Sequence, residues 1–352
     1  MAKQLLPKAR IPLKHLLLVG WMPSAVKKWV YRTFFGYRIG EQVTLSFGSA
    51  IVGDNVDIGD HVEIGLLAVI QGRSITIGRY SSVGTMSYLS CNVIEIGEDA
   101  KIREQVFVGG PQLPESRFSL GSRTIVLQMT NINPTKPVVI GDDTGIGGHC
   151  LIFTHGSWLN ILDGYPVSYE PVTIGNSVWL PWRVFIMPGT TIGDGSVIGA
   201  NSLVQGTIPP GSLAVGSPAK VIRSAPDFPR VPDEERRRAL VEEMLAEFDR
   251  FVADQSVTVT SDAVSRTYTF AGTRWRLLRV RGGDGGVPSD VGRDDTVLAE
   301  MPLGADARAA LRAKNAYWLD LAGRTRSRDG SPLTEELALF IGRYGIRLPR
   351  DS

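Results

Sequence analysis

The sequence predicts a mainly β fold built as a solenoid, in which short strands stack coil upon coil. An aliphatic residue followed by glycine returns every six residues, as in Ile58-Gly59 and Ile192-Gly193. Asp, Asn or Gly often occupies the next two places, and these residues suit tight corners. Strands of a β-sandwich alternate by two and recur at roughly 8–12 residues. The strict period of six therefore favours a solenoid.

The six-residue period also predicts the shape of each coil. A strand of about five residues spans roughly 17 Å before a turn must follow. If one aliphatic side chain per segment points inward, three segments close a triangular coil. The next coil then stacks on it through main-chain hydrogen bonds, about 4.8 Å away.

Residues 1–38 form a basic segment that we expect to be helical. The segment holds eight Lys or Arg residues and no Asp or Glu. Its apolar run is interrupted by Lys14, His15 and Pro23, so it is too short to span a bilayer and does not resemble a signal peptide. It is expected to cap the open end of the solenoid. An amphipathic helix at a membrane surface is the alternative, and both roles are compatible.

Residues 39–224 carry the repeat, with two interruptions. The pattern is lost over 111–137 and again over 157–172, so we expect a loop excursion at each place. Long excursions from a regular scaffold usually carry function.

Residues 225–352 change in character and predict a separate α+β domain of unknown role. Three prolines precede an amphipathic pattern over 233–254, which predicts a helix. Alternating strands are expected near 257–260, 268–270 and 275–280. A Gly- and Asp-rich loop is expected over 282–295, and helices near 305–317 and 333–344.

Composition limits the class of protein. Hydrophobic residues make up 43% of the chain and charged residues 21%, as in an ordinary soluble protein. Cys91 and Cys150 stand at repeat positions that favour small inward side chains, and neither has zinc-site spacing. Such sparse cysteine fits a reducing cytoplasm.

The solenoid ends in a recognisable way, with Pro209-Pro210-Gly211 followed by Gly216-Ser217-Pro218-Ala219-Lys220. Together with the six-residue repeat, this ending resembles the hexapeptide-repeat acyltransferases, in their sugar and xenobiotic acetyltransferase branch. The resemblance implies a left-handed parallel β-helix and a homotrimer whose active sites lie between subunits. It also implies acetyl-CoA or another acyl-CoA as co-substrate, with no metal.

His155 is the candidate catalytic residue. Acyl transfer to a hydroxyl or amine needs a group that accepts a proton near neutral pH, and the chain has only four histidines. A similar Thr-His before a loop, followed by Pro-Val-x-Ile-Gly and a Trp, marks the catalytic histidine of the family; here the later elements are 171–175 and Trp179. The resemblance implies that His155 is the general base for direct transfer in a ternary complex. Ser157 follows it where relatives often carry an orienting partner, so that partner is unassigned.

The resemblance also suggests binding residues. The acceptor would contact His149, Trp158, Asp163 and Glu170. The pantetheine arm and nucleotide of the co-substrate would contact Trp179, Trp182, Gly199, Ala200, Asn201, Ser202, Lys220 and Arg223.

The leading hypothesis is an acyl-CoA-dependent O- or N-acyltransferase that acts on a sugar or glycan precursor. We expect it to be cytoplasmic, with possible contact to the inner face of the membrane through residues 1–38, and we expect no nucleic-acid partner. A non-catalytic scaffold is one alternative. The other is a metal hydratase like the γ-class carbonic anhydrases, which share the solenoid but need three histidine ligands.

Overall fold

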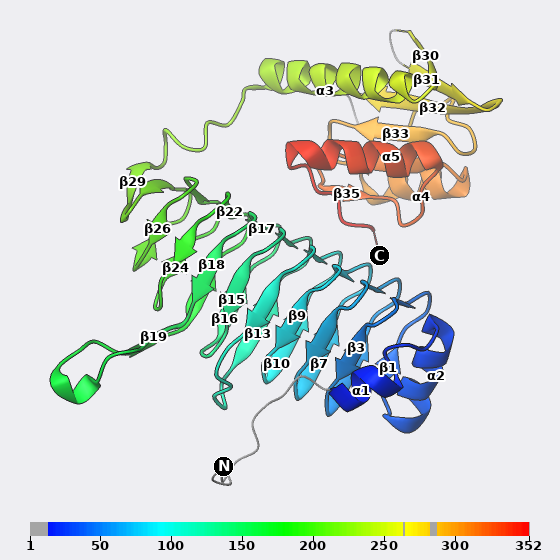
Figure 1. Cartoon of the computed structure of the whole chain (residues 1–352). Helices are drawn as coiled ribbons and strands as arrows, with labels where there is room; N and C mark the ends of the chain where they lie inside the picture. Colours follow the sequence, from blue (N-terminus) through cyan, green and yellow to red (C-terminus); the bar gives the residue numbers. More distant parts are fainter. Residues whose placement is uncertain (1–12, 263–264, 282–286, 352) are drawn as a thin grey trace. The chain divides into compact units, whose positions relative to one another are not determined.

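The computed structural model describes residues 13–262, 265–281 and 287–351. The chain forms two compact units, Met1–Arg230 and Val231–Ser352 (Figure 1). The domain boundary expected at 224/225 from the prolines thus falls six residues earlier than the division between these units.

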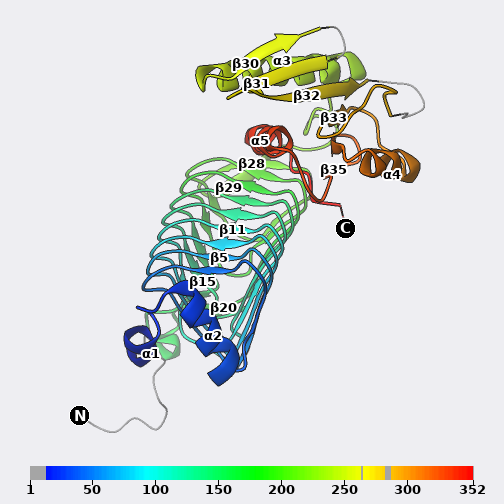
Figure 2. The same ribbon diagram turned by 90° about the vertical axis from the view of Figure 1, so that its right-hand side faces the viewer.

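The first unit is a left-handed parallel β-helix with three faces (Figure 2). Face A consists of β1 (Arg38–Ile39), β4 (Asn55–Ile58), β7 (Ser74–Ile77), β10 (Val93–Ile96), β13 (Arg117–Leu120), β16 (Val138–Ile140), β21 (Val172–Ile174), β24 (Thr191–Ile192) and β27 (Thr207–Ile208). Face B consists of β2 (Thr44–Leu45), β5 (Glu63–Ile64), β8 (Ser82–Val83), β11 (Lys101–Ile102), β14 (Ile125–Val126), β17 (Gly145–Ile146), β22 (Trp179–Leu180), β25 (Val197–Ile198), β28 (Leu213–Gly216) and β29 (Ala219–Arg223). Face C consists of β3 (Ala50–Val52), β6 (Val69–Gln71), β9 (Tyr88–Ser90), β12 (Phe107–Gly109), β15 (Asn131–Asn133), β18 (Leu151–Phe153), β23 (Phe185–Ile186) and β26 (Leu203–Val204).

Each coil passes through faces A, B and C in turn, so the prism has an A–B, a B–C and a C–A corner. The strands pair in parallel with those of the next coil, except that β29 returns antiparallel to β28. The aliphatic residue of each repeat points inward, and Ile64, Ile140 and Ile198 are all buried. The predicted register of the repeat is confirmed at these positions.

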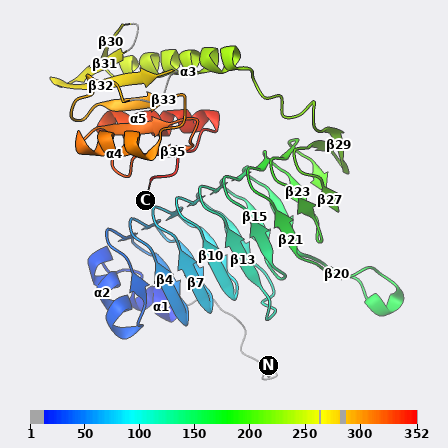
Figure 3. The same ribbon diagram turned by 180° about the vertical axis from the view of Figure 1, so that it is seen from behind.

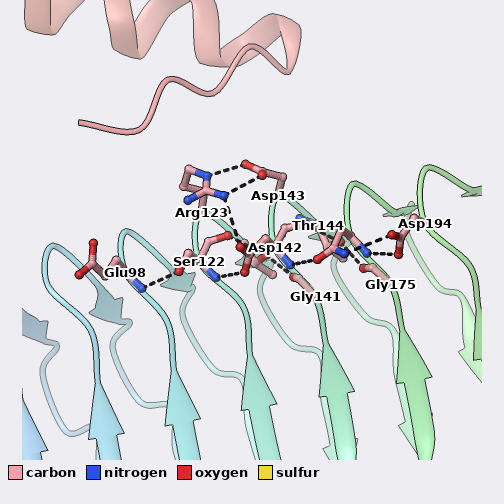
Figure 4. A network of polar contacts seen from close by, with 11 residues as sticks. Glu98, Ser122, Arg123, Gly141, Asp142, Asp143, Thr144, Gly175 and Asp194 are labelled. Atoms are coloured by element: carbon pink, nitrogen blue, oxygen red, sulfur yellow. Dashed lines mark hydrogen bonds and ion pairs between the residues drawn. The ribbon is translucent and has the colours of Figure 1, made fainter. Parts of the chain in front are cut away.

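Side chains at the A–B corner explain why a polar residue follows the repeat glycine (Figure 4). The Oδ1 of Asp142 accepts a hydrogen bond from the backbone N–H of Ser122 at 2.8 Å. The Oδ1 of Asn176 accepts in the same way from Asp142, and the Oδ1 of Asp194 from Asn176, both at 2.8 Å. A Cβ at Gly141 would lie 2.5 Å from the Asn176 Oδ1, so glycine leaves room for this ladder.

The expected loop over 111–137 is wrong, because most of that segment forms a regular coil with β13, β14 and β15. Phe118 replaces the usual aliphatic residue in the core, and Leu120, Val126 and Ile132 continue the inward columns. Only residues 110–116 leave the coil, as an enlarged C–A corner between β12 and β13. Because Phe118 is not aliphatic and the insertion changes the spacing between strands, the six-residue period cannot be followed in the sequence of this segment.

The second expected excursion is a genuine departure from the coil. After β18 the chain forms a hairpin of β19 (His155–Gly156) and β20 (Ser168–Tyr169), with a short 3-10 helix, η1 (Ile161–Asp163), near its tip. Figures 1 and 3 show this hairpin projecting from the solenoid.

Two helices, α1 (Leu13–Leu18) and α2 (Ser24–Phe34), lie at the first coil (Figure 1). The Nζ of Lys27 is buried and donates to the carbonyl oxygens of Ser46 at 2.7 Å and Ser49 at 3.0 Å. The hydroxyl of Tyr31 accepts from the backbone N–H of Ile51 at 3.0 Å. These contacts satisfy backbone groups of the first coil, as the expected cap requires. None of the helices in the described ranges is long and apolar enough to cross a membrane.

The second unit is α+β. Its six-stranded sheet has the order β30 (Thr258–Ser261), β31 (Ser265–Phe270), β32 (Thr273–Val280), β33 (Thr296–Ala299), β34 (Tyr317–Asp320) and β35 (Thr325–Arg326). Its helices are α3 (Glu234–Asp254), α4 (Ala305–Ala313) and α5 (Pro332–Ile341), followed by the 3-10 turn η2 (Gly342–Tyr344). The helix predicted over 233–254 is confirmed, with Asp233 as its N-cap. The helix predicted over 305–317 ends earlier, because Tyr317 begins β34. Residues 282–286 of the predicted loop lie outside the described residues.

Candidate functional site

His155 lies where the chain leaves the solenoid at the C–A corner. The preceding Thr154 is buried, and its hydroxyl donates to the Asn133 carbonyl at 2.7 Å and accepts from the Lys136 N–H at 2.9 Å. The Thr154 carbonyl accepts from the N–H of Glu170 at 2.9 Å, which closes the base of the hairpin. The backbone of His155 is therefore held by the coil on one side and by β20 on the other.

The imidazole ring of His155 is stacked on Tyr169. The ring centroids lie 5.7 Å apart with an angle of 16° between the planes. The Nδ1 of His155 is buried and has no hydrogen-bond partner among the described residues. A buried imidazole nitrogen without a partner is costly and calls for an explanation, such as a functional role.

The carboxylates of Asp163 and Glu170, which were expected to contact the acceptor, make other contacts within the chain. Asp163 accepts from the Asn160 Nδ2 at 3.0 Å within the hairpin. The carboxylate of Glu170 lies over Gly189, where a Cβ would come within 2.3 Å of its Oε2. No described hydrogen bond joins either carboxylate to His155, so the orienting group remains unassigned within the chain.

The tip of the hairpin exposes large apolar side chains. Trp158 is 96% exposed and Leu162 is 90% exposed, and Ile161 is exposed beside them. Exposed apolar side chains that gather in one segment are typical of interaction sites.

His149, one of the predicted acceptor contacts, does not lie near His155 within the chain. His149 occupies the B–C corner with φ of 55°, and β18 separates it from His155 at the C–A corner. Six residues of extended chain span roughly 20 Å. His149 instead lies beside Trp182, with ring centroids 5.7 Å apart.

Most of the predicted co-substrate residues collect on face B and the B–C corner of the last coils. The rings of Trp179 and Trp182 cover Gly145 and Gly148, where an added Cβ would lie 2.5 Å from a ring atom. In the next coil, Asn201 donates its N–H to the Trp182 carbonyl at 3.1 Å. Beside it the buried Ser202 Oγ accepts from Gly216 at 3.0 Å. Of the other predicted residues, Gly199 and Ala200 share this turn, and Lys220 and Arg223 are exposed on β29.

The candidate site is therefore divided between two corners of one chain, with face C between them. Aromatic side chains cover part of the outer side of face C: Tyr88 stacks on Phe107 with centroids 5.5 Å apart, and Phe153 packs edge-on against Phe185 at 5.7 Å. The outer side of face A is polar, with ion pairs such as Arg38–Asp57.

Sequence reasoning missed Tyr169 and gave Thr154 no role beyond its place in the Thr-His pair, although both hold His155 in place. Thr154 could have been recognised because small polar residues recur at inward corner positions. No comparable signal marks Tyr169, since it comes from the far arm of the hairpin. Within the described ranges, no three His, Cys, Asp or Glu side chains gather as metal ligands.

These features define a β-helix of six-residue repeats, with His155 at one corner at the base of a hairpin. Residues 171–206 match the family model described as bacterial transferase hexapeptide (six repeats). Galactoside O-acetyltransferase of Escherichia coli K12 is 36% identical over 142 residues, which are 38% of this chain and 64% of that protein. A putative acetyltransferase of Staphylococcus aureus Mu50 is 48% identical over 75 residues, 21% of this chain and 35% of the relative. The chain thus covers less than two thirds of either relative.

Solved structures give weaker likenesses. A galactoside acetyltransferase in complex with coenzyme A is 22% identical, with 61% of this chain and 79% of that chain covered and a TM-score of 0.27. The polySia specific acetyltransferase NeuO is 19% identical, covers 59% of this chain and 93% of its own, and has a TM-score of 0.36. In its repeat and its sequence relatives, the solenoid is similar to hexapeptide-repeat transferases, and these relatives are named acetyltransferases.

Proposed function

We propose that the protein transfers an acyl group, most simply acetyl, from acyl-CoA to a hydroxyl or amine of a sugar or glycan precursor. The observation that carries the proposal is His155, held at the base of the hairpin with an unpartnered buried Nδ1. The sequence likeness to a galactoside O-acetyltransferase supports the reaction class and the sugar acceptor.

In the proposed reaction His155 acts as general base. Its imidazole takes the proton of the acceptor while the acceptor oxygen or nitrogen attacks the thioester carbonyl. The tetrahedral intermediate collapses to the acylated acceptor, and the departing thiolate of coenzyme A takes the proton back from the imidazolium. Stacking on Tyr169 keeps the ring in one orientation, which such a step requires.

We further propose a homotrimer with active sites between subunits. If face C turns toward the threefold axis, its apolar outer side is covered by neighbouring copies. The C–A corner of one copy then meets the B–C corner of the next. That arrangement would bring His155 of one chain to Trp182 and Asn201 of its neighbour, which one chain alone does not do.

We expect the reaction in the cytoplasm, in keeping with two free, buried cysteines. Contact with the membrane surface through the basic N-terminal segment is supported by exposed Trp21, Trp29 and Phe34.

The test is thiol release from acetyl-CoA with a panel of sugar acceptors. His155→Ala should lower kcat/KM by ~10²-fold or more, the usual contribution of a general base. His61→Ala, which alters a histidine stacked on Tyr80 at the A–B corner, serves as matched control and should keep activity. Failure of the wild-type protein to bind coenzyme A would refute the proposal and favour the scaffold.

A further inference from the structure

A polar cleft lies at the C–A corner of the early coils, away from His155 but on the same corner. It has a volume of about 410 Å³. Its polar lining comes from Asp54, Gln71, Arg73, Asn92 and Gln112. The size lies within the usual range of small-molecule sites.

One wall of the cleft is the enlarged corner at 110–116. Earlier C–A corners contain only two residues, such as Gly72-Arg73 between β6 and β7. The insertion is held in place by the Asn92 Nδ2, which donates to the carbonyls of Leu113 at 2.6 Å and Pro114 at 3.2 Å. The Nε2 of Gln112 donates to the Ser90 Oγ at 3.0 Å. These hydrogen bonds hold residues 110–116 against the corner, where they form one side of the cleft.

The cleft contains polar groups that the described residues leave unused. The Oε1 of Gln71 is buried without a hydrogen-bond partner. The side chains of Arg73 and Asp54 are exposed and form no described hydrogen bond or ion pair. A guanidinium donor, a carboxylate acceptor and amide groups in one cleft suit a ligand that both donates and accepts hydrogen bonds. Sugar hydroxyls do both, whereas a phosphate or other anion would meet Asp54.

The position of the cleft relates it to His155. The cleft spans the corners after β3, β6 and β9, while His155 follows β18, three coils beyond β9. At about 4.8 Å per coil, the separation along the corner is roughly 14 Å. A single sugar does not bridge that distance, but a short carbohydrate chain does.

We propose that this corner cleft binds a sugar unit of an oligomeric acceptor whose reacting unit lies at His155. The inference rests on the proposed acyl transfer and adds that the natural acceptor is a glycan chain. Arg73 and Gln71 would form hydrogen bonds to hydroxyls of the sugar unit in the cleft. Residues 110–116 would limit where the glycan chain can run along the corner.

The experiment compares galactose, glucose and N-acetylglucosamine with their linear oligomers as acceptors. Wild-type protein should show a higher kcat/KM for at least one oligomer than for its monomer. Arg73→Ala should reduce that preference about tenfold, the effect of losing a hydrogen bond to a charged group. Arg79→Ala, an exposed arginine at the A–B corner, is the matched control and should keep the preference.

Binding of the same oligomers without acyl-CoA, measured by calorimetry, separates the two proposals. Binding that depends on Arg73 in a protein without turnover would support the cleft and refute the acyl transfer. Turnover without length preference, or with a preference that Arg73→Ala leaves intact, would overturn the cleft while the transferase stands. A change in subunit assembly on Arg73→Ala would identify the cleft as a subunit contact and also overturn it.

Discussion

At the scale of single residues, the corner ladder shows how a short side chain joins successive coils. Asn176 both accepts from the Asp142 N–H and donates its Nδ2 to the Asp194 carboxylate at 3.2 Å. Three coils therefore share one amide side chain, which accounts for the preference for Asp and Asn after the repeat glycine.

Asn176→Ala should lower the free energy of unfolding by about 1 kcal/mol, the net value of an exposed hydrogen-bond pair. Asn176→Asp keeps the acceptor but sets a second carboxylate against that of Asp194, so at neutral pH it should lose at least as much. Urea denaturation of both variants provides the comparison, and unchanged stability in both variants would show that the ladder does not stabilise the coils.

Lys27 is the second residue whose environment leads to a prediction. Burial lowers the pKa of its ammonium group from 10.5 to about 8. The unfolded chain then binds more protons than the folded chain between these two values, so stability rises with pH in that window. The stabilisation of the folded state is fully present above the unfolded pKa of 10.5 and is lost as the pH falls through about 8.

The melting temperature of wild-type protein should therefore rise between about pH 8 and pH 10 relative to Lys27→Met, which removes the titrating group. Scanning calorimetry of both proteins at several pH values gives this difference. A constant difference across the window would mean that the carbonyls of Ser46 and Ser49 keep the ammonium at its ordinary pKa.

The residue scale also shows what the sequence could and could not predict. The period of six placed the inward aliphatic residues because each coil repeats the same steric requirement. His155 was singled out as a candidate because it follows a strand and precedes a break, which is where the structure places it. Its stacking partner Tyr169 depends on how the hairpin closes, which no periodic pattern encodes.

At the scale of elements, the hairpin of β19 and β20 combines a fixed base with an exposed apolar tip. Trp158 contributes little to the fold of a single chain, because almost all of its surface is exposed. The exposed ring is therefore available for a contact outside the chain, and we expect that contact to be with the acceptor or with a neighbouring copy.

Trp158→Ala should leave the melting temperature of the solenoid within about 2 °C, as is usual for exposed positions, and lower kcat/KM about tenfold. Steady-state kinetics and thermal unfolding give the two readouts. Loss of stability with unchanged turnover would instead mean that Trp158 supports the fold of its own chain and makes no contact that the reaction needs.

The segment 111–137 was predicted to be a loop, but most of it forms a regular coil with β13, β14 and β15. Phe118 is fully buried in the core of its coil, yet it does not match an aliphatic repeat. The insertion at 110–116 then shifts the count of residues between strands. Periodicity detects strands only while corners keep one length, so the coil after a long corner was assigned to a loop.

At the scale of the whole β-helix, the three faces differ in a way that the repeat does not reveal. The same inward pattern recurs on each face, so the period says nothing about which outer side is covered. Leu151 on face C and Val139 on face A are both outward-facing and 37% and 39% exposed, respectively. Only the former lies on the apolar face.

This pair gives a matched test of assembly. Leu151→Lys should convert the proposed trimer to monomer, because a charge on the covered face must be desolvated. Val139→Lys should leave the assembly intact. Sedimentation velocity distinguishes the two outcomes, and equal behaviour of the variants would exclude face C as the contact.

The division of the site between two corners leads to the last prediction. His155→Ala and Trp182→Ala should each be inactive alone, since each removes one half of every site. Co-refolded mixtures should regain activity, because some contacts pair the intact C–A corner of one copy with the intact B–C corner of another. In a random trimer roughly a quarter of the sites are restored in this way. The same two preparations mixed without refolding are the control. Mixed trimers that stay inactive would mean that each chain supplies its whole site, and that His155 works with groups on its own corner.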